Sequence, residues 1–426
     1  MEPRGKPSRL RARAHPCRRN TVNDTRPTTV VCLSSFLKGH DFIRECKRLG
    51  CRVLLITVEK LRDADWPRES IDEVFYMPDL YQREDVIHGV SYLARSEHID
   101  RIVPLDEFDL EMASTLREHL RVPGMGETTV RYFRDKLAMR MRAQEAGIAV
   151  PEFVPILQND RVRQYLETVP PPWVLKPRLS ASAIGIRKLD DPDEVWRIIE
   201  ELGDRRSFHL LERFVRGDVF HVDSLAWEKE ILFAEAHGYL NPPFEVYHGG
   251  GLFCTRTLPR DSDTARALKD LDQEVAIALG MVRGALHTEF IRGEEDGRFY
   301  FLETAARVGG ANIADMTEAA TGINLWREWA RLEVASARRE EYRAPEARDD
   351  SAGLLISLAR QEWPDTGAYD DPEIVWRLNK RHHAGLLVAS PSQERVEGLL
   401  RQYMERFRED FHASMPAPET AAQAVD

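Results

Sequence analysis

Residues 287–312, which read HTEFIRGEEDGRFYFLETAARVGGAN, contain the side chains whose types and spacing best suit chemistry. Two short apolar runs, 284–291 and 298–304, flank a polar turn, and this pattern predicts a β-hairpin. Glu289 lies in the first run and Glu303 in the second. A carboxylate among apolar strand residues is costly unless it is paired or binds a metal. Two carboxylates on neighbouring strands therefore predict a site for one or two Mg²⁺ ions, which prefer carboxylate oxygen.

A basic residue follows this pair closely. Arg307 stands four residues after Glu303, just before Gly309 and Gly310. A fixed guanidinium beside a carboxylate–Mg²⁺ site suits phosphoryl transfer, because it stabilises the charge that develops during the transfer. The alternative interpretation is a hairpin with two salt-bridged glutamates, since structural ion pairs occupy carboxylates in the same way.

A lysine and a loop of small residues suggest where an anion binds. Lys176 lies in the predicted strand 173–178, and the loop 179–185 that follows reads LSASAIG. Small side chains let backbone N–H groups and the hydroxyls of Ser180 and Ser182 approach an anion closely. The alternatives are a strand-edge lysine and an ordinary hairpin turn.

The elements that position these residues begin with an N-terminal domain. Strands alternate with helices over residues 28–126, which predicts a doubly wound parallel sheet. No GxGxxG follows the first strand, so dinucleotide binding is not predicted. We expect a domain this small to lend one wall of a larger site. Its predicted strands are 29–34, 52–57, 74–77 and 101–105.

The rest of the chain contains further elements that bear chemical groups. A predicted helix over 128–146 carries Lys136, and a largely apolar run, 209–215, carries Glu212. The loop 239–253, rich in Pro and Gly, has the composition of a mobile cover and is our candidate for substrate recognition. Further predicted elements are strands at 220–225, 231–234, 354–359 and 384–390 and helices at 263–279 and 311–320.

Length and composition limit the class of protein. The 426 residues suggest two or three domains, and 42% hydrophobic with 31% charged residues is typical of a soluble globular protein. No apolar run approaches the ~18 residues that span a bilayer, so no membrane partner is predicted. The five cysteines show no CxxC spacing, which predicts reduced, structural thiols and a cytoplasmic location.

The charge is unevenly distributed along the chain. The net charge is −11, but residues 1–26 hold eight basic and two acidic residues, so the remainder carries −17. An acidic body argues against nucleic acid as the main partner. The basic segment lacks the apolar stretch of a secretory signal. We expect it to be a disordered leader, or an artefact of where translation was assumed to start.

Five segments in this order resemble the ATP-grasp superfamily, over about residues 28 to 412. They are DKLAMRMRAQEAGIAVP from Asp135, WVLKPRLSASAIG from Trp173, LLERFVRGDVFHVD from Leu210, HTEF from His287 and FLETAARVGG from Phe301. The resemblance implies an α/β protein whose N-terminal domain precedes a two-lobed α+β core with antiparallel sheets. The implied parts are a disordered leader 1–27, an N-terminal domain 28–126, a small lobe 127–206, a core lobe 207–347, a C-terminal α/β subdomain 348–412 and a disordered tail 413–426.

The resemblance also implies cofactors and residue roles. The cofactors are ATP and Mg²⁺, with Mn²⁺ as a possible substitute. By the resemblance, Glu289 and Glu303 hold the metal and Arg307 faces the γ-phosphate. Arg307 and Lys176 are the implied catalytic residues. The implied ATP contacts are Lys136 and Lys176 at the phosphates, Ser180, Ser182 and Gly185 in the loop above them, Glu212 with backbone groups of Arg213 and Val215 at adenine, and Asp218 at the ribose.

One position departs from the common pattern of the superfamily. Many members have Glu-x-Asn, in which the Asn is a metal ligand, and here that position is Ala305. The L-amino-acid ligase branch, whose members make dipeptides, is similar in this respect, with an HTE strand and an Asn a few residues after the Arg, here Asn312. Asn312 and His287 are therefore candidate site residues, although a helix-start Asn and a strand His are commonly structural.

The activity implied by the resemblance is ATP-dependent ligation of a small-molecule carboxylate to an amine, with amino acids as the expected class. An acyl phosphate would be the intermediate, and ADP and phosphate the other products. No GxSxG or other nucleophile constellation predicts a covalent enzyme intermediate. Two alternatives remain open: biotin-carboxylase-like carboxylation, and an ATP-binding regulator without catalysis. A homodimer is a further possibility that the resemblance implies.

Overall fold

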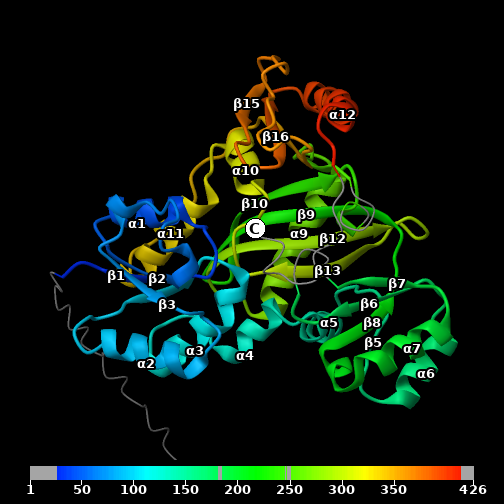
Figure 1. The fold of residues 1–426 in the computed structure, drawn as a ribbon, viewed down its shortest axis with the longest axis horizontal. Helices are drawn as coiled ribbons and strands as arrows, with labels where there is room; N and C mark the ends of the chain where they lie inside the picture. The colour runs from blue at the N-terminus through cyan, green and yellow to red at the C-terminus, as the bar shows by residue number, and fades with distance from the viewer. Residues whose placement is uncertain (1–25, 181–184, 245, 247–250, 414–426) are drawn as a thin grey trace, which may run out of the picture.

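Three β-sheets organise the protein (Figure 1). The structure, a computed structural model, describes residues 26–180, 185–244, 246 and 251–413. Within these residues there is a four-stranded parallel sheet, a central eight-stranded sheet and a smaller four-stranded antiparallel sheet. The predicted fold class, a parallel N-terminal sheet followed by antiparallel sheets, is confirmed.

The N-terminal part is a doubly wound parallel sheet. Its elements are β1 (Thr29–Ser34), α1 (His40–Arg48), β2 (Arg52–Val58), β3 (Glu73–Met77), α2 (Arg83–Leu93), β4 (Arg101–Pro104) and α3 (Leu110–Leu120). The strand order is β3-β2-β1-β4, and every pair is parallel. Val30 and Cys32 of β1 pack on the side of α1, whereas Val31 and Leu33 pack with α2 and α3. Helices therefore cover both faces, as the alternation of strands and helices predicts.

The segment predicted as one helix over 128–146 is broken, so that prediction was wrong. It forms α4 (Glu127–Val130), a 3-10 helix η4 (Arg131–Phe133) and α5 (Lys136–Glu145). Asp135 has an extended backbone, with φ −94° and ψ 106°, and its carboxylate accepts a hydrogen bond from the N–H of Leu137 at 3.1 Å. An Asp in this conformation caps a new helix. Lys136 is therefore the first residue of α5, and its N–H donates to the carbonyl of Arg178 at 2.9 Å.

The small antiparallel sheet contains four strands and is covered by two helices. They are β5 (Phe153–Pro155), α6 (Asn159–Thr168), β6 (Trp173–Pro177), β7 (Arg187–Leu189), α7 (Pro192–Leu202) and β8 (His209–Arg213). The strand order is β5-β8-β6-β7. β8 pairs with β5 and β6 and so belongs to this sheet, although it follows the predicted lobe boundary between 206 and 207.

The central sheet has the order β13-β12-β9-β10-β11-β14-β16-β15. Its strands are β9 (Gly217–Trp227), β10 (Glu230–Tyr239), β11 (Phe253–Thr257), β12 (Gly284–Gly293), β13 (Phe299–Ala305), β14 (Ser351–Leu358), β15 (Ile374–Arg377) and β16 (His383–Ser390). Its helices are α9 (Asp263–Leu279), α10 (Ile313–Thr321), α11 (Leu325–Arg338) and α12 (Gln393–Asp410). The C-terminal subdomain predicted over 348–412 therefore continues this sheet, since β14 pairs with β11.

The predicted hairpin over 284–304 is confirmed as the antiparallel pair β12 and β13. Glu289 and Glu303 are direct partners in its register, and the register shifts after Glu289. Among the described residues, no helix combines the length and apolar character that a bilayer span requires. The remaining 3-10 helices are η1 (Glu59–Leu61), η2 (Arg68–Ser70), η3 (Glu107–Asp109) and η5 (Gly203–Phe208).

A buried carboxyl group lies between α9 and the central sheet. Asp272 is 0% exposed. Burial raises the pKa of Asp272 to about 6, although the hydroxyls of Ser224 and Thr288 act in the opposite direction. Between pH ~4 and ~6 the folded protein therefore binds more protons at this group than the unfolded chain does. The free energy of unfolding must fall as the pH rises through this window.

We expect Asp272→Asn to remove this pH dependence, because the amide stays neutral. The free energy of unfolding of the variant minus that of wild type should increase from pH 4.5 to pH 7.5. The increase should be at most about 3 kcal/mol for a shift of about two pKa units. Urea denaturation at both pH values measures the gain. The exposed Asp270→Asn on the same helix is the matched control. A gain that is equal at both pH values contradicts the prediction.

Candidate active site

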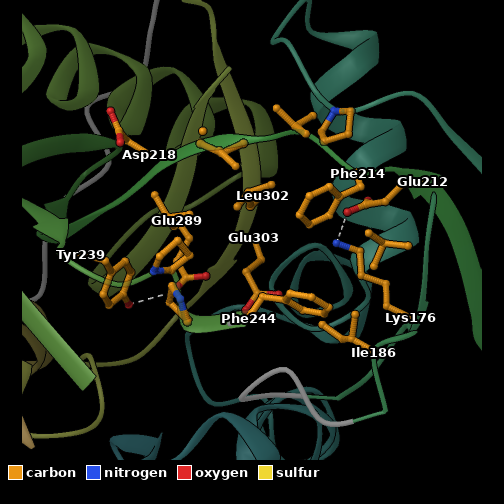
Figure 2. A pocket seen from close by; sticks show the side chains of 18 of the residues that line it. Lys176, Ile186, Glu212, Phe214, Asp218, Tyr239, Phe244, Glu289, Leu302 and Glu303 are labelled. Carbon is orange, nitrogen blue, oxygen red and sulfur yellow. Dashed lines mark hydrogen bonds and ion pairs between the residues drawn. The ribbon is translucent and has the colours of Figure 1, made fainter. Parts of the chain in front are cut away.

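A cavity of about 1150 Å³ lies where the small sheet, the central sheet and the N-terminal part meet (Figure 2). The five residues of the predicted phosphate and metal site all line it, although they come from four separate segments of the chain. These residues are Lys136, Lys176, Glu289, Glu303 and Arg307. Figure 2 shows Glu289 and Glu303 between Tyr239 on one side and the Lys176–Glu212 pair on the other.

The two strand glutamates face the cavity with different partners. Glu303 Oε2 lies 2.8 Å from Lys136 Nζ, and Glu289 Oε1 accepts a hydrogen bond from the Tyr239 hydroxyl at 2.9 Å. Burial acts to raise the pKa of Glu289, but His287 and Tyr239 outweigh it and hold the pKa below its usual range. Side-chain exposures of 19% and 33% leave both carboxylates open to the cavity. Two open carboxylates from facing strands fit a divalent cation.

A buried aspartate holds His287 beside this pair. Asp223 Oδ1 lies 3.0 Å from His287 Nδ1, and Asp223 Oδ2 lies 2.7 Å from His221 Nδ1. Burial acts to lower the pKa of His287, but Asp223 outweighs it and raises the pKa to about 10. His287 is therefore a cation at neutral pH, with Nε2 3.8 Å from Glu289 Oε1. His221, Asp223 and His287 have the spacing of a metal site, but their mutual hydrogen bonds already account for the arrangement.

Lys176 is held by a buried carboxylate that the sequence analysis had assigned to adenine. Glu212 is ion-paired with Lys176, and its Oε2 lies 3.0 Å from Arg140 Nε. Burial lowers the pKa of Lys176 to about 8, although Glu212 opposes the shift. The sequence analysis missed Arg140, which lies one helical turn after Lys136 and so shares its face of α5.

Arg307 is held in the cavity wall by the N-terminal part of the chain. Its Nε donates to Glu107 Oε2 at 3.1 Å, and Arg134 Nη1 donates to Glu107 Oε1 at 3.0 Å. Burial acts to raise the pKa of Glu107, but Arg307 and Arg134 outweigh it and lower the pKa to about 2. Glu107 lies three residues after the end of β4, beyond the carboxyl end of a parallel strand, where ligand sites are common in such sheets. The N-terminal domain thus supplies one wall, as expected.

Four other predicted ATP contacts also line the cavity: Ser180, Arg213, Val215 and Asp218. The carbonyl of Ser180 accepts a hydrogen bond from Lys136 Nζ at 2.6 Å. The backbone N–H of Arg213 already donates to the carbonyl of Glu152 at 2.8 Å, so this donor is not open to adenine. Asp218 Oδ2 lies 2.8 Å from Arg292 Nη2.

Two predicted site residues, Gly185 and Asn312, do not line the cavity, and some predicted positions are not described by the structure. Ser182 and residues 245 and 247–250 of the predicted recognition loop lie outside the described residues. Gly185 has φ +73°, and a Cβ there would lie 2.9 Å from Pro177 Cγ, so its role is to let the loop turn. Asn312 is absent from the described cavity lining, because its Nδ2 donates to Asp315 Oδ2 at 2.9 Å. Its role as a catalytic residue stays a prediction.

No protein-family model matches the chain. The chain is 27% identical over 242 residues to the L-arginine-specific L-amino acid ligase of Bacillus subtilis. The matched region covers 55% of this chain and 58% of that relative. The solved L-amino acid ligase from Bacillus licheniformis gives a TM-score of 0.71 at 20% identity, over 91% of this chain and 98% of that one. The chain has the ATP-grasp fold.

A more distant ATP-grasp structure shows the same architecture. The biotin carboxylase domain of Hydrogenobacter thermophilus 2-oxoglutarate carboxylase, in complex with MgADP, ADP and bicarbonate, gives a TM-score of 0.67 at 16% identity over 90% of each chain. The sequence similarity to the Bacillus subtilis ligase, together with the shared fold, confirms the resemblance inferred from five sequence segments. The chain aligns with little more than half of the Bacillus subtilis ligase, so the substrate specificity of that relative does not transfer by sequence alone.

The buried group of Lys176, Glu212 and Arg140 gives a stability prediction. Glu212→Gln leaves two buried cations without a carboxylate, which typically costs about 3–5 kcal/mol of the free energy of unfolding. Adding Lys176→Met to that variant should recover part of the loss, because one of the two cations is then removed. Urea denaturation measures both effects, with the exposed Lys188→Met as the control. A double variant no more stable than Glu212→Gln contradicts the prediction.

Proposed function

We propose that the protein is an ATP-dependent ligase that joins a small carboxylate to an amine through an acyl phosphate. The observation that supports this most strongly is the meeting of two lysines, two strand glutamates and an arginine in one cavity. The similarity to two L-amino acid ligases supports the same class of reaction and favours amino acids as substrates.

The cavity has separate regions that fit the parts of Mg²⁺-ATP. Near Lys176 it is lined by apolar side chains from both lobes, which suit a purine ring: Val174, Ile186, Phe214, Val215 and Leu302. Lys136 and Lys176 would contact the phosphates, and Glu289 and Glu303 would hold Mg²⁺ or Mn²⁺. The bound metal would offset phosphate charge during transfer. The carboxylate oxygens of these two glutamates are the type of ligand that such cations prefer.

In the proposed reaction, a carboxylate oxygen of the substrate attacks the γ-phosphorus, and the bond from that phosphorus to the ADP oxygen breaks. The amine nitrogen then attacks the acyl carbon and loses a proton, and phosphate leaves. Arg307, fixed by Glu107, would stabilise the charge on the transferring group and on the acyl phosphate. Glu212 would act as a positioning residue that orients Lys176. The enclosing walls would keep water away from the acyl phosphate.

The test is a screen for ADP and phosphate release over pairs of amino acids, with mass spectrometry of the products. We expect release that requires both a carboxylate and an amine, and a product whose mass equals the two substrates minus water. Bicarbonate is included because one similar structure contains it. Release that depends on bicarbonate alone would support carboxylation instead. Tight ATP binding with no release under any mixture would support a regulator.

The matched variants in this screen are Glu303→Gln and Glu295→Gln. Glu303 faces Glu289, whereas Glu295 is exposed in the turn of the same hairpin. We expect Glu303→Gln to lower the rate of ADP release at least ~100-fold, as the loss of one charge-stabilising group commonly does. It should also weaken Mn²⁺ binding measured by electron paramagnetic resonance. An active Glu303→Gln variant would remove the metal assignment.

A further inference from the structure

A second cavity, of about 200 Å³, lies at the seam between the N-terminal part and the central sheet. One side comes from α3 and from the segment 123–126 that follows it, and the other from α11 and the turn between α9 and β12. Ala306 also lines this cavity, while the next residue, Arg307, lines the first. The two cavities therefore lie on either side of the same short segment.

Positive charge from both sides of the seam meets at this cavity. Arg117 from α3 and Arg283 from the turn before β12 both line it, and Glu333 of α11 is the one carboxylate among its described lining residues. Arg101 lies behind Glu333: the Nε atoms of Arg101 and Arg283 are each 3.4 Å from the same oxygen, Glu333 Oε2. These distances exceed those of a close charge-assisted hydrogen bond. Glu333 is thus shared between two guanidiniums that repel one another, and the further carboxylate near Arg283, that of the exposed Glu228, lies 3.7 Å from its Nη1.

The hydrogen-bond acceptors of Arg117 are neutral backbone carbonyls, so they do not balance its positive charge. Its Nε donates to the carbonyl of Ile102 at 2.8 Å and its Nη1 to the carbonyl of Met125 at 3.4 Å. Burial lowers the pKa of Arg117 to about 10, Glu333 opposes this, and Arg283 adds to the lowering. Arg117 is thus a buried cation whose environment favours an additional anion.

A residue that lines this cavity also has an unpartnered donor. Trp329 is 3% exposed, and its indole N–H has no acceptor among the described residues. A Cβ built on Gly284, another lining residue, would lie 3.4 Å from Trp329 Nε1, so the glycine leaves the space next to this donor free of a side chain. A buried N–H without an acceptor costs about 1–3 kcal/mol. A ligand that offers an acceptor oxygen would remove that cost.

We propose that this cavity binds a small oxyanion, of the size of phosphate or acetate, between Arg117, Arg283 and the indole N–H of Trp329. The anion neutralises like charges contributed by two parts of the chain and so fastens the N-terminal part to the core. This site is separate from the nucleotide cavity, and the proposal does not depend on the ligase activity.

The test measures the melting temperature of the full chain at constant ionic strength while chloride is replaced by phosphate or by acetate. Wild type should be stabilised by at least one of them. Trp329→Phe keeps an aromatic side chain but removes the indole N–H, and it should raise the half-saturating anion concentration about fivefold. Arg283→Met should abolish the response and raise the melting temperature in chloride alone, because it removes one of the repelling charges.

The nucleotide cavity also attracts phosphate, so Lys176→Met is measured in parallel. If the anion binds at the seam, the rise in melting temperature should survive Lys176→Met and weaken in Trp329→Phe. A response lost in Lys176→Met and unchanged in Trp329→Phe overturns the proposal, as does the absence of any response to either anion. Stabilisation by phosphate but not acetate identifies a phosphate-type ligand, and the reverse identifies a carboxylate. Selenate soaked into crystals should give an anomalous peak beside Trp329, and a peak in the nucleotide cavity alone contradicts the proposal.

Discussion

The repulsion between Glu289 and Glu303 is the constraint on which the rest of the site depends. Their places in the register of β12 and β13 put two carboxylates directly opposite each other. Like charges on directly opposed residues of neighbouring strands repel one another. Lys136 on one side and His287 on the other offset part of this charge. Both carboxylates remain partly exposed to the cavity, where a divalent cation would offset the rest.

Buried anions hold the other site cations in place, and they come from different parts of the chain. Glu107 follows the N-terminal parallel sheet and holds Arg307. Glu212 belongs to the small sheet and holds Lys176, and Asp223 of the central sheet does the same for His287. A cation fixed in advance needs little reorganisation when charge develops beside it. The Glu107–Arg307 pair also joins the N-terminal part to the central sheet, so the position of Arg307 is linked to the packing of these two parts.

The sequence predicted the parts of this site that local patterns specify. The hairpin, Lys176 and the parallel sheet follow from alternation and apolar runs, which act over a few residues. Glu107 and Asp223 were missed because their partners, Arg307 and His287, lie 200 and 64 residues away. The break at Asp135 was missed although Asp is a strong helix-capping residue, and an N-cap reading would have placed Lys136 at the start of α5.

The central claim is that Glu289 and Glu303 hold the metal of a bound nucleotide. The most direct measurement is anomalous scattering from a crystal grown with Mn²⁺ and a non-hydrolysable ATP analogue. The account predicts a manganese peak between these two carboxylates, in contact with the phosphates. A peak at His221, Asp223 and His287 instead, or a nucleotide bound with no metal near Glu303, would contradict it.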